Sequence, residues 1–76
     1  MIDLFILETC PYCLKVMEYL DKNHIEYRKI DISNQASENS LIQIGGKRQV
    51  PFLVDNDRNI QMYESKDIIE YLKTIV

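Results

Sequence analysis

Residues 2–20 read IDLFILETCPYCLKVMEYL, and this stretch decides the fold. Its first part, residues 2–7, is apolar except for Asp3, which is typical of a strand buried on both faces at the centre of a sheet. Residues 11–23 predict a helix, because apolar side chains recur there at helical spacing. Pro11 suits the first turn of this helix, where its missing N–H would have no partner. Two cysteines therefore lie where a central strand meets a helix.

The remainder of the sequence extends this unit to the element order βαβαββα. The further elements expected are a strand over residues 26–32, a helix from Ser33-Asn34 to Gly45-Gly46, strands over 51–54 and 60–63 joined by a turn at 55–57, and a last helix capped by Ser65. A strand-helix-strand unit implies two parallel strands, and the last two strands form an antiparallel hairpin. The sequence thus predicts an α/β fold with a four-stranded mixed sheet flanked by three helices, in a single domain over residues 1–76.

The composition excludes several classes of protein. The 76 residues carry 9 basic and 12 acidic side chains, a net charge of −3, and the scattered basic residues argue against nucleic-acid binding. Two cysteines cannot form the disulfide framework of a secreted mini-protein. With His24 as the only histidine, the chain lacks the ligands for a closed zinc site, so no metal is expected. No stretch predicts a signal peptide or a membrane span, so we expect a cytoplasmic protein. In that compartment a close cysteine pair is catalytic or metal-binding rather than structural.

Cys10 and Cys13 carry the strongest functional signal. With Pro11 as the first helical residue, Cys10 becomes the N-cap, and the backbone N–H groups of Tyr12 and Cys13 point toward its sulfur. These donors and the positive end of the helix dipole favour the thiolate form of Cys10. Cys13 is expected to stay a thiol and is near enough to close a disulfide. Cys10 is therefore predicted as the nucleophile of thiol–disulfide exchange and Cys13 as the resolving thiol, with half a zinc site or an accidental pair as the alternatives.

From Cys10-Pro-Tyr-Cys13 outward, essentially the whole chain resembles the glutaredoxins, whose thioredoxin-like fold has the predicted element order. Val50-Pro51 is similar to the Thr-Val-Pro segment of that family, with Gln49 in the place of the usual threonine. The resemblance implies a cis peptide bond before Pro51, which leaves the backbone N–H and C=O of Val50 to bind the extended backbone of glutathione or a peptide. Tyr12, between the cysteines, is a further candidate contact.

A second resemblance lies at the start of the last predicted helix. Glu64-Ser65 is similar to the Glu-Ser pair of glutathione-transferase N-terminal domains, which implies that these two residues hold the γ-glutamyl end of glutathione. A helix N-terminus with a serine hydroxyl suits a carboxylate, and Glu64 suits an ammonium group.

Two positions depart from the glutaredoxin pattern. Leu7 stands where a lysine is common, and Glu38 stands where a glutamine is common. Compared with that pattern, Leu7 removes a cation and Glu38 adds an anion. Both changes are expected to weaken the binding of glutathione, a tripeptide with two carboxylates. Lys47 and Arg48 are the cations placed to compensate.

Together these features predict a glutathione-dependent thiol–disulfide oxidoreductase that reduces protein disulfides and glutathione mixed disulfides. It is expected to be a monomer with no bound cofactor, to use glutathione as co-substrate and to act on disulfide-containing or glutathionylated proteins. One alternative is a redoxin served by thioredoxin reductase that supplies electrons to an enzyme such as ribonucleotide reductase. Another is a carrier of a [2Fe–2S] cluster, held in a dimer by Cys10 of each chain and two glutathiones; Pro11 counts against it.

Overall fold

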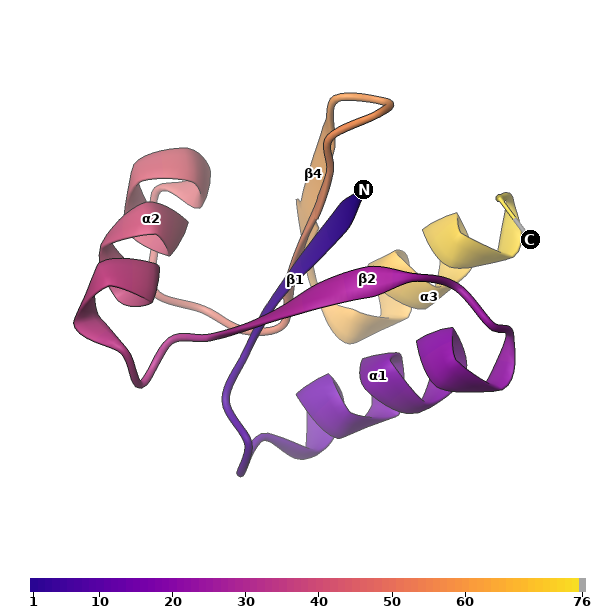
Figure 1. Cartoon of the computed structure of the whole chain (residues 1–76), viewed down its shortest axis with the longest axis horizontal. Helices are drawn as coiled ribbons and strands as arrows, with labels where there is room; N and C mark the ends of the chain where they lie inside the picture. The colour runs from indigo at the N-terminus through magenta and orange to yellow at the C-terminus, as the bar shows by residue number, and fades with distance from the viewer. Residues whose placement is uncertain (76) are drawn as a thin grey trace.

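The computed structural model describes residues 1–75 and has the element order predicted from the sequence (Figure 1). Its sheet has the strand order β2-β1-β3-β4, with the strands β1 (Ile2–Ile6), β2 (Tyr27–Asp31), β3 (Phe52–Asp55) and β4 (Ile60–Tyr63). β1 pairs parallel with β2 and antiparallel with β3, and β3 pairs antiparallel with β4. The predicted mixed sheet, with its parallel unit and its C-terminal hairpin, is confirmed.

Helices cover both faces of this sheet: α1 (Pro11–Lys22), α2 (Gln35–Gly45) and α3 (Ser65–Lys73). α1 and α3 pack together on one face, and α2 lies on the other (Figure 1). β1 is buried on both faces, as predicted, because its side chains alternate between two cores. Phe5 packs in the core with Leu41 of α2, and three side chains enter the core below α1 and α3: Ile2, Leu4 and Ile6. None of the helices within residues 1–75 has the length and apolar character needed to cross a membrane.

The pairing of the strands gathers three segments at one end of the sheet. α1 begins soon after β1 ends, and Phe5 near that end lies opposite Phe52, the first residue of β3. Phe52 in turn lies opposite Tyr63, the last residue of β4, directly before α3. The start of α1, the loop that enters β3 and the start of α3 therefore come together, although they are far apart in the sequence.

One local prediction is incomplete and another is wrong. The turn after β3 is present, and its backbone N–H groups at Asp57 and Arg58 donate to the Asp55 carboxylate, but Asp55 itself is the last residue of β3. It is fully buried because its carboxylate also accepts hydrogen bonds from the Tyr71 hydroxyl and the Arg58 guanidinium. Ser65 is not the cap of α3 but its first residue. The N-cap is Glu64, which has a φ of 72° and makes no capping hydrogen bond with its side chain.

Candidate active site around the two cysteines

Cys10 is the N-cap residue of α1, as its place before Pro11 predicted. Its backbone is extended, with φ −85° and ψ 114°, and its Sγ accepts a hydrogen bond of 3.3 Å from the backbone N–H of Cys13. The other expected donor, the N–H of Tyr12, makes no hydrogen bond to this sulfur in the described part of the chain. The Cys10 side chain is only half-buried. This sulfur thus faces the positive end of a helix dipole and is open to a reactant.

Cys13 lies one turn further along α1 and is fully buried in the core between the sheet and the two adjacent helices. Burial, together with the neighbouring Cys10 sulfur, raises the pKa of the Cys13 thiol to about 12. Both cysteines are free thiols. Cys13 therefore stays protonated at neutral pH, as predicted, and exposure distinguishes the two sulfurs.

A cavity of about 320 Å³ lies where the three chain segments meet, and its lining includes Tyr12, a residue between the two cysteines. Its lining contains all five residues predicted to contact glutathione, together with Gln49. The start of α1 supplies one of them, the loop before β3 supplies two and the start of α3 supplies two: Tyr12, Val50, Pro51, Glu64 and Ser65. Residues scattered over most of the sequence thus line one cavity.

The loop before β3 presents its backbone to this cavity. The Val50–Pro51 peptide bond is cis, as the resemblance implied, and the Pro51 side chain is buried. Within residues 1–75, neither the N–H nor the C=O of Val50 takes part in a hydrogen bond. Both groups are available to an extended ligand, which would bind as a short added strand.

Gln49 is the one lining residue that the sequence argument missed. Its Nε2 donates a hydrogen bond of 3.3 Å to Oε1 of Glu64. A signal for it was present, because Gln49 stands directly before Val50-Pro51 at the position where glutaredoxins usually have threonine.

The charges near the cavity are arranged differently from the expectation. Glu38 of α2 forms an ion pair with Arg48, and the hydrogen bond from Arg48 holds the pKa of Glu38 below its usual range. The ammonium of Lys47 lies over an aromatic ring of β4, 4.8 Å from the ring centroid. Leu7 packs at the edge of the core beneath α2. Among the lining residues described, Glu64 is the only charged one.

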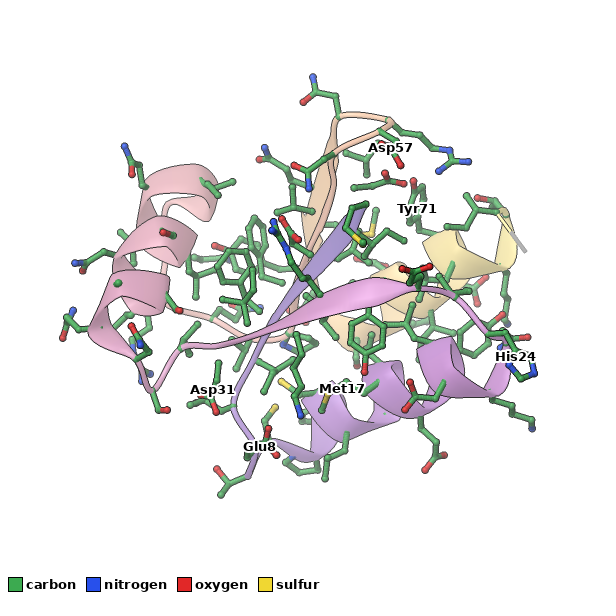
Figure 2. All side chains as sticks on the ribbon, viewed as in Figure 1. Glu8, Met17, His24, Asp31, Asp57 and Tyr71 are labelled. Atoms are coloured by element: carbon green, nitrogen blue, oxygen red, sulfur yellow. The ribbon has the colours of Figure 1, made fainter. Side chains whose placement is uncertain are left out.

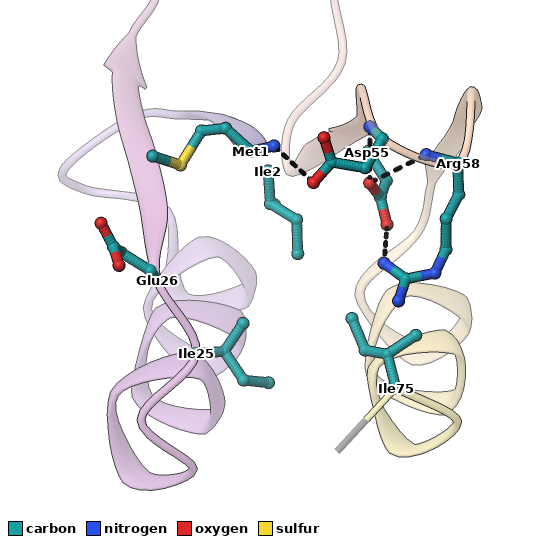
Figure 3. Close-up of a pocket in the computed structure, with 8 residues that line it drawn as sticks. Met1, Ile2, Ile25, Glu26, Asp55, Arg58 and Ile75 are labelled. Carbon is teal, nitrogen blue, oxygen red and sulfur yellow. Dashed lines mark hydrogen bonds and ion pairs between the residues drawn. The ribbon is translucent and has the colours of Figure 1, made fainter.

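A second cavity, of about 330 Å³, lies at the opposite end of the sheet (Figure 3). It is lined in part by Ile2 and Asp55, which face each other where β1 starts and β3 ends. In Figure 2, Asp57 and Tyr71 mark this end of the molecule, and Glu8 marks the end where α1 begins. Neither cavity has a cysteine in its described lining, but only the first includes Tyr12, which lies between the two cysteines. Within residues 1–75, no three potential metal ligands gather at either cavity or elsewhere.

A central strand that runs into a helix capped by Cys10, with a cis-proline loop at the same end of the sheet, defines the class of thioredoxin-like proteins. A solved thioredoxin-like protein, BC3987, has the same fold, with a TM-score of 0.84, 23% identity and coverage of 100% of both chains. Within this class, residues 4–75 match the model of the glutathione S-transferase N-terminal domain. The chain belongs to that family.

Glutaredoxins are similar to this chain as well. Glutaredoxin 1 of Rickettsia prowazekii is 37% identical over 57 residues, which cover 70% of this chain and 60% of the relative. The chain thus spans less than two thirds of that relative's length. Glutaredoxin 2 of Salmonella typhimurium, solved in complex with glutathione, has a TM-score of 0.83 at 24% identity over 99% of this chain and 34% of its own. Both resemblances found in the sequence, to glutaredoxins and to glutathione-transferase N-terminal domains, are confirmed.

Proposed function

We propose that this protein is a glutathione-dependent thiol–disulfide oxidoreductase of the glutaredoxin type. The observation that carries the proposal is the position of the half-exposed Cys10 sulfur, held at a helix N-terminus with the buried Cys13 behind it. The cavity at the start of α1, with the unpaired Val50 backbone in its lining, supports it. The relatives named glutaredoxin and the glutathione complex of a protein with the same fold support it too. No bound cofactor is needed, and one chain contains the complete site.

The reaction begins at the exposed sulfur. The Cys10 thiolate attacks one sulfur of a substrate disulfide, the substrate S–S bond breaks, and the departing sulfur takes the electron pair and a proton from solvent. Cys13 then loses its proton and attacks the Cys10 sulfur, which releases the reduced substrate and leaves a Cys10–Cys13 disulfide. Two glutathione thiols reduce this disulfide and leave as oxidised glutathione. A glutathionylated substrate needs Cys10 alone, because a second glutathione can displace the first.

The cavity residues supply the binding of glutathione. The N–H and C=O of Val50 pair with its backbone, and Pro51 places them beside Cys10. Tyr12 covers the ligand from the start of α1. Glu64 and Ser65 hold its γ-glutamyl end at the N-terminus of α3, where a carboxylate is favoured by the helix dipole.

One observation favours a second reductant. Glutathione carries two carboxylates, and the cavity lining as described contains neither lysine nor arginine. Arg48 neutralises Glu38 instead of reaching a ligand. Reduction by thioredoxin reductase, in a redoxin that donates electrons to another enzyme, is therefore the competing function.

Two coupled assays of NADPH oxidation decide between these functions. In one assay glutathione and glutathione reductase supply electrons, and in the other thioredoxin reductase does, with the same disulfide substrate in both. The proposal expects turnover in the glutathione assay, with Cys10→Ser as the inactive control. Turnover with thioredoxin reductase alone would refute it and support the second function.

A further inference from the structure

Gln49 and Glu64 form a hydrogen-bonded pair within the candidate glutathione cavity. The Gln49 side-chain amide donates to the Glu64 carboxylate at 3.3 Å, and both residues line the cavity. Glu64 is the N-cap of α3, yet its side chain does not cap the helix, and its φ of 72° is unusual for a residue with a side chain. The carboxylate thus accepts a hydrogen bond from Gln49 instead of capping the helix.

The backbone holds the two residues together as well. The carbonyl of Lys47 accepts a hydrogen bond of 3.2 Å from the N–H of Gln49 and one of 2.8 Å from the hydroxyl of Tyr63. Tyr63 directly precedes Glu64, and its ring packs against Phe52 with 4.4 Å between the centroids. The turn that carries Gln49 is therefore tied to the strand end that carries Glu64, so the side-chain pair rests on a fixed frame.

The electrostatics of the pair determine which ligand group it suits. A primary amide is neutral, so it orients the carboxylate without cancelling its charge. Glu64 has no ion-pair partner among the described residues and is the only charged residue in the described lining. A carboxylate that is fixed but not neutralised attracts a cationic donor and repels an anion.

We infer that Gln49 is a positioning residue that fixes the Glu64 carboxylate, so that the cavity selects thiol ligands with a free ammonium group. This inference rests on the proposed function, because the thiol of the ligand must reach Cys10. The contact of Glu64 with the γ-glutamyl end belongs to that function, and the inference adds the residue that positions Glu64 for it.

The test compares glutathione with glutaryl-cysteinylglycine, which lacks only the amino group. Each thiol reduces the Cys10–Cys13 disulfide of this protein. The readout is the KM for glutaryl-cysteinylglycine divided by the KM for glutathione. Because Glu64 is exposed, the wild-type protein is expected to prefer glutathione by roughly threefold to fivefold. Gln49→Leu is expected to lower this preference to less than about twofold, and Gln49→Thr, whose side chain is too short to reach Glu64, is expected to do the same.

A double-mutant cycle separates positioning from a general effect on the cavity. Glu64→Gln is expected to abolish the preference, and adding Gln49→Leu to it is expected to change the ratio no further. Gln61→Leu, the same substitution at an exposed position of β4, serves as the matched control and is expected to keep the wild-type ratio.

Two results overturn the inference. One is a wild-type ratio that both Gln49 variants retain while thermal unfolding shows them to be folded. The other is a loss of preference caused by Gln49→Leu that is equally large in the wild-type protein and in the Glu64→Gln variant. Failure of the proposed function gives a different result, namely a wild-type protein that dithiothreitol reduces but neither glutathione nor its analogue does.

Discussion

The backbone N–H of Cys13 donates a hydrogen bond of 3.3 Å to the sulfur of Cys10, so the buried residue supports the exposed one through its main chain. A substitution at Cys13 removes its thiol but keeps this donor. The hydrogen bond to the Cys10 sulfur and the resolving reaction proposed for Cys13 can therefore be separated by mutation.

The first prediction uses this separation. Cys13→Ser is expected to keep the reduction of a glutathionylated peptide, which needs one thiol, and to lose the reduction of a protein disulfide, which needs two. Cys10→Ser is expected to lose both activities, by more than about 100-fold, because it removes the nucleophile itself. Both rates are measured with glutathione in excess, and activity retained by Cys10→Ser would contradict the assignment.

The second prediction concerns alkaline pH. Burial raises the pKa of Cys13 from an ordinary 9.0 to about 12, so the folded protein holds this proton at pH values where the unfolded chain has lost it. The stability that this proton linkage contributes is therefore complete below about pH 9 and is lost as the pH rises toward about 12. Tyrosines and lysines titrate in the same range, so the comparison is with Cys13→Ala. In urea unfolding between neutral pH and about pH 11, the variant is expected to lose less stability than the wild type. Equal losses in the two proteins would disprove the linkage.

The third prediction concerns the buried carboxylate of Asp55. Burial acts to raise its pKa, but hydrogen bonds from Tyr71, Arg58 and two backbone N–H groups outweigh burial and hold the pKa below its ordinary 3.8. Stability from Asp55 is therefore present above about pH 4 and is lost as the pH falls through the folded-state pKa. Tyr71→Phe is expected to lower the free energy of unfolding by about 1–3 kcal/mol at neutral pH and to reduce its fall in acid.

Tyr19→Phe is the matched control for this prediction. Tyr19 is also half-buried, and within the described residues its hydroxyl makes no hydrogen bond. Its removal is expected to change the unfolding free energy by less than about 0.5 kcal/mol. If both variants are equally stable at every pH, Asp55 does not depend on Tyr71.

The fourth prediction compares the two glycines at the end of α2. A Cβ at Gly45 would lie 2.1 Å from the Tyr63 hydroxyl oxygen, whereas a Cβ at Gly46 would meet nothing within 4 Å but would sit on a backbone with φ +90°. Gly45→Ala is therefore expected to lower the free energy of unfolding by about 2 kcal/mol, even after the gain in helix propensity. Gly46→Ala is expected to lower it by about 1 kcal/mol. Urea unfolding measures both, and a larger cost at Gly46 would show that backbone conformation outweighs the contact with Tyr63.

Patterns along the chain were sufficient for the fold and for the reactive end of the site. The apolar run of β1 and the position of Pro11 predict a central strand, a helix start and Cys10 at its N-cap. Asp55 shows where this reasoning is incomplete. In a sequence, an aspartate beside asparagine and a second aspartate indicates a turn, and only the fold reveals that Tyr71 and Arg58 come close enough to make its burial favourable.

The charges of the site were harder to predict for the same reason. In the sequence, Glu38 stands where glutaredoxins commonly have glutamine. Arg48, ten residues later, is a cation expected to compensate for it. In the structure they neutralise each other. The hydrogen bond between Gln49 and Glu64 also joins positions that no local pattern connects, because it depends on how the loop before β3 meets the start of α3.

Cys13 belongs both to the hydrophobic core and to the cysteine pair of the proposed reaction, and this dual membership connects the interior of the protein to that reaction. A thermodynamic cycle links folding with oxidation of the two thiols. Any change that stabilises the folded dithiol form more than the folded disulfide form raises the reduction potential, and so the oxidising power, of the pair by the same free energy, at about 30 mV for each 1.4 kcal/mol. The reduction potential is thus open to adjustment from the packing around Val16 and Ile68, without a change to any residue that touches a substrate.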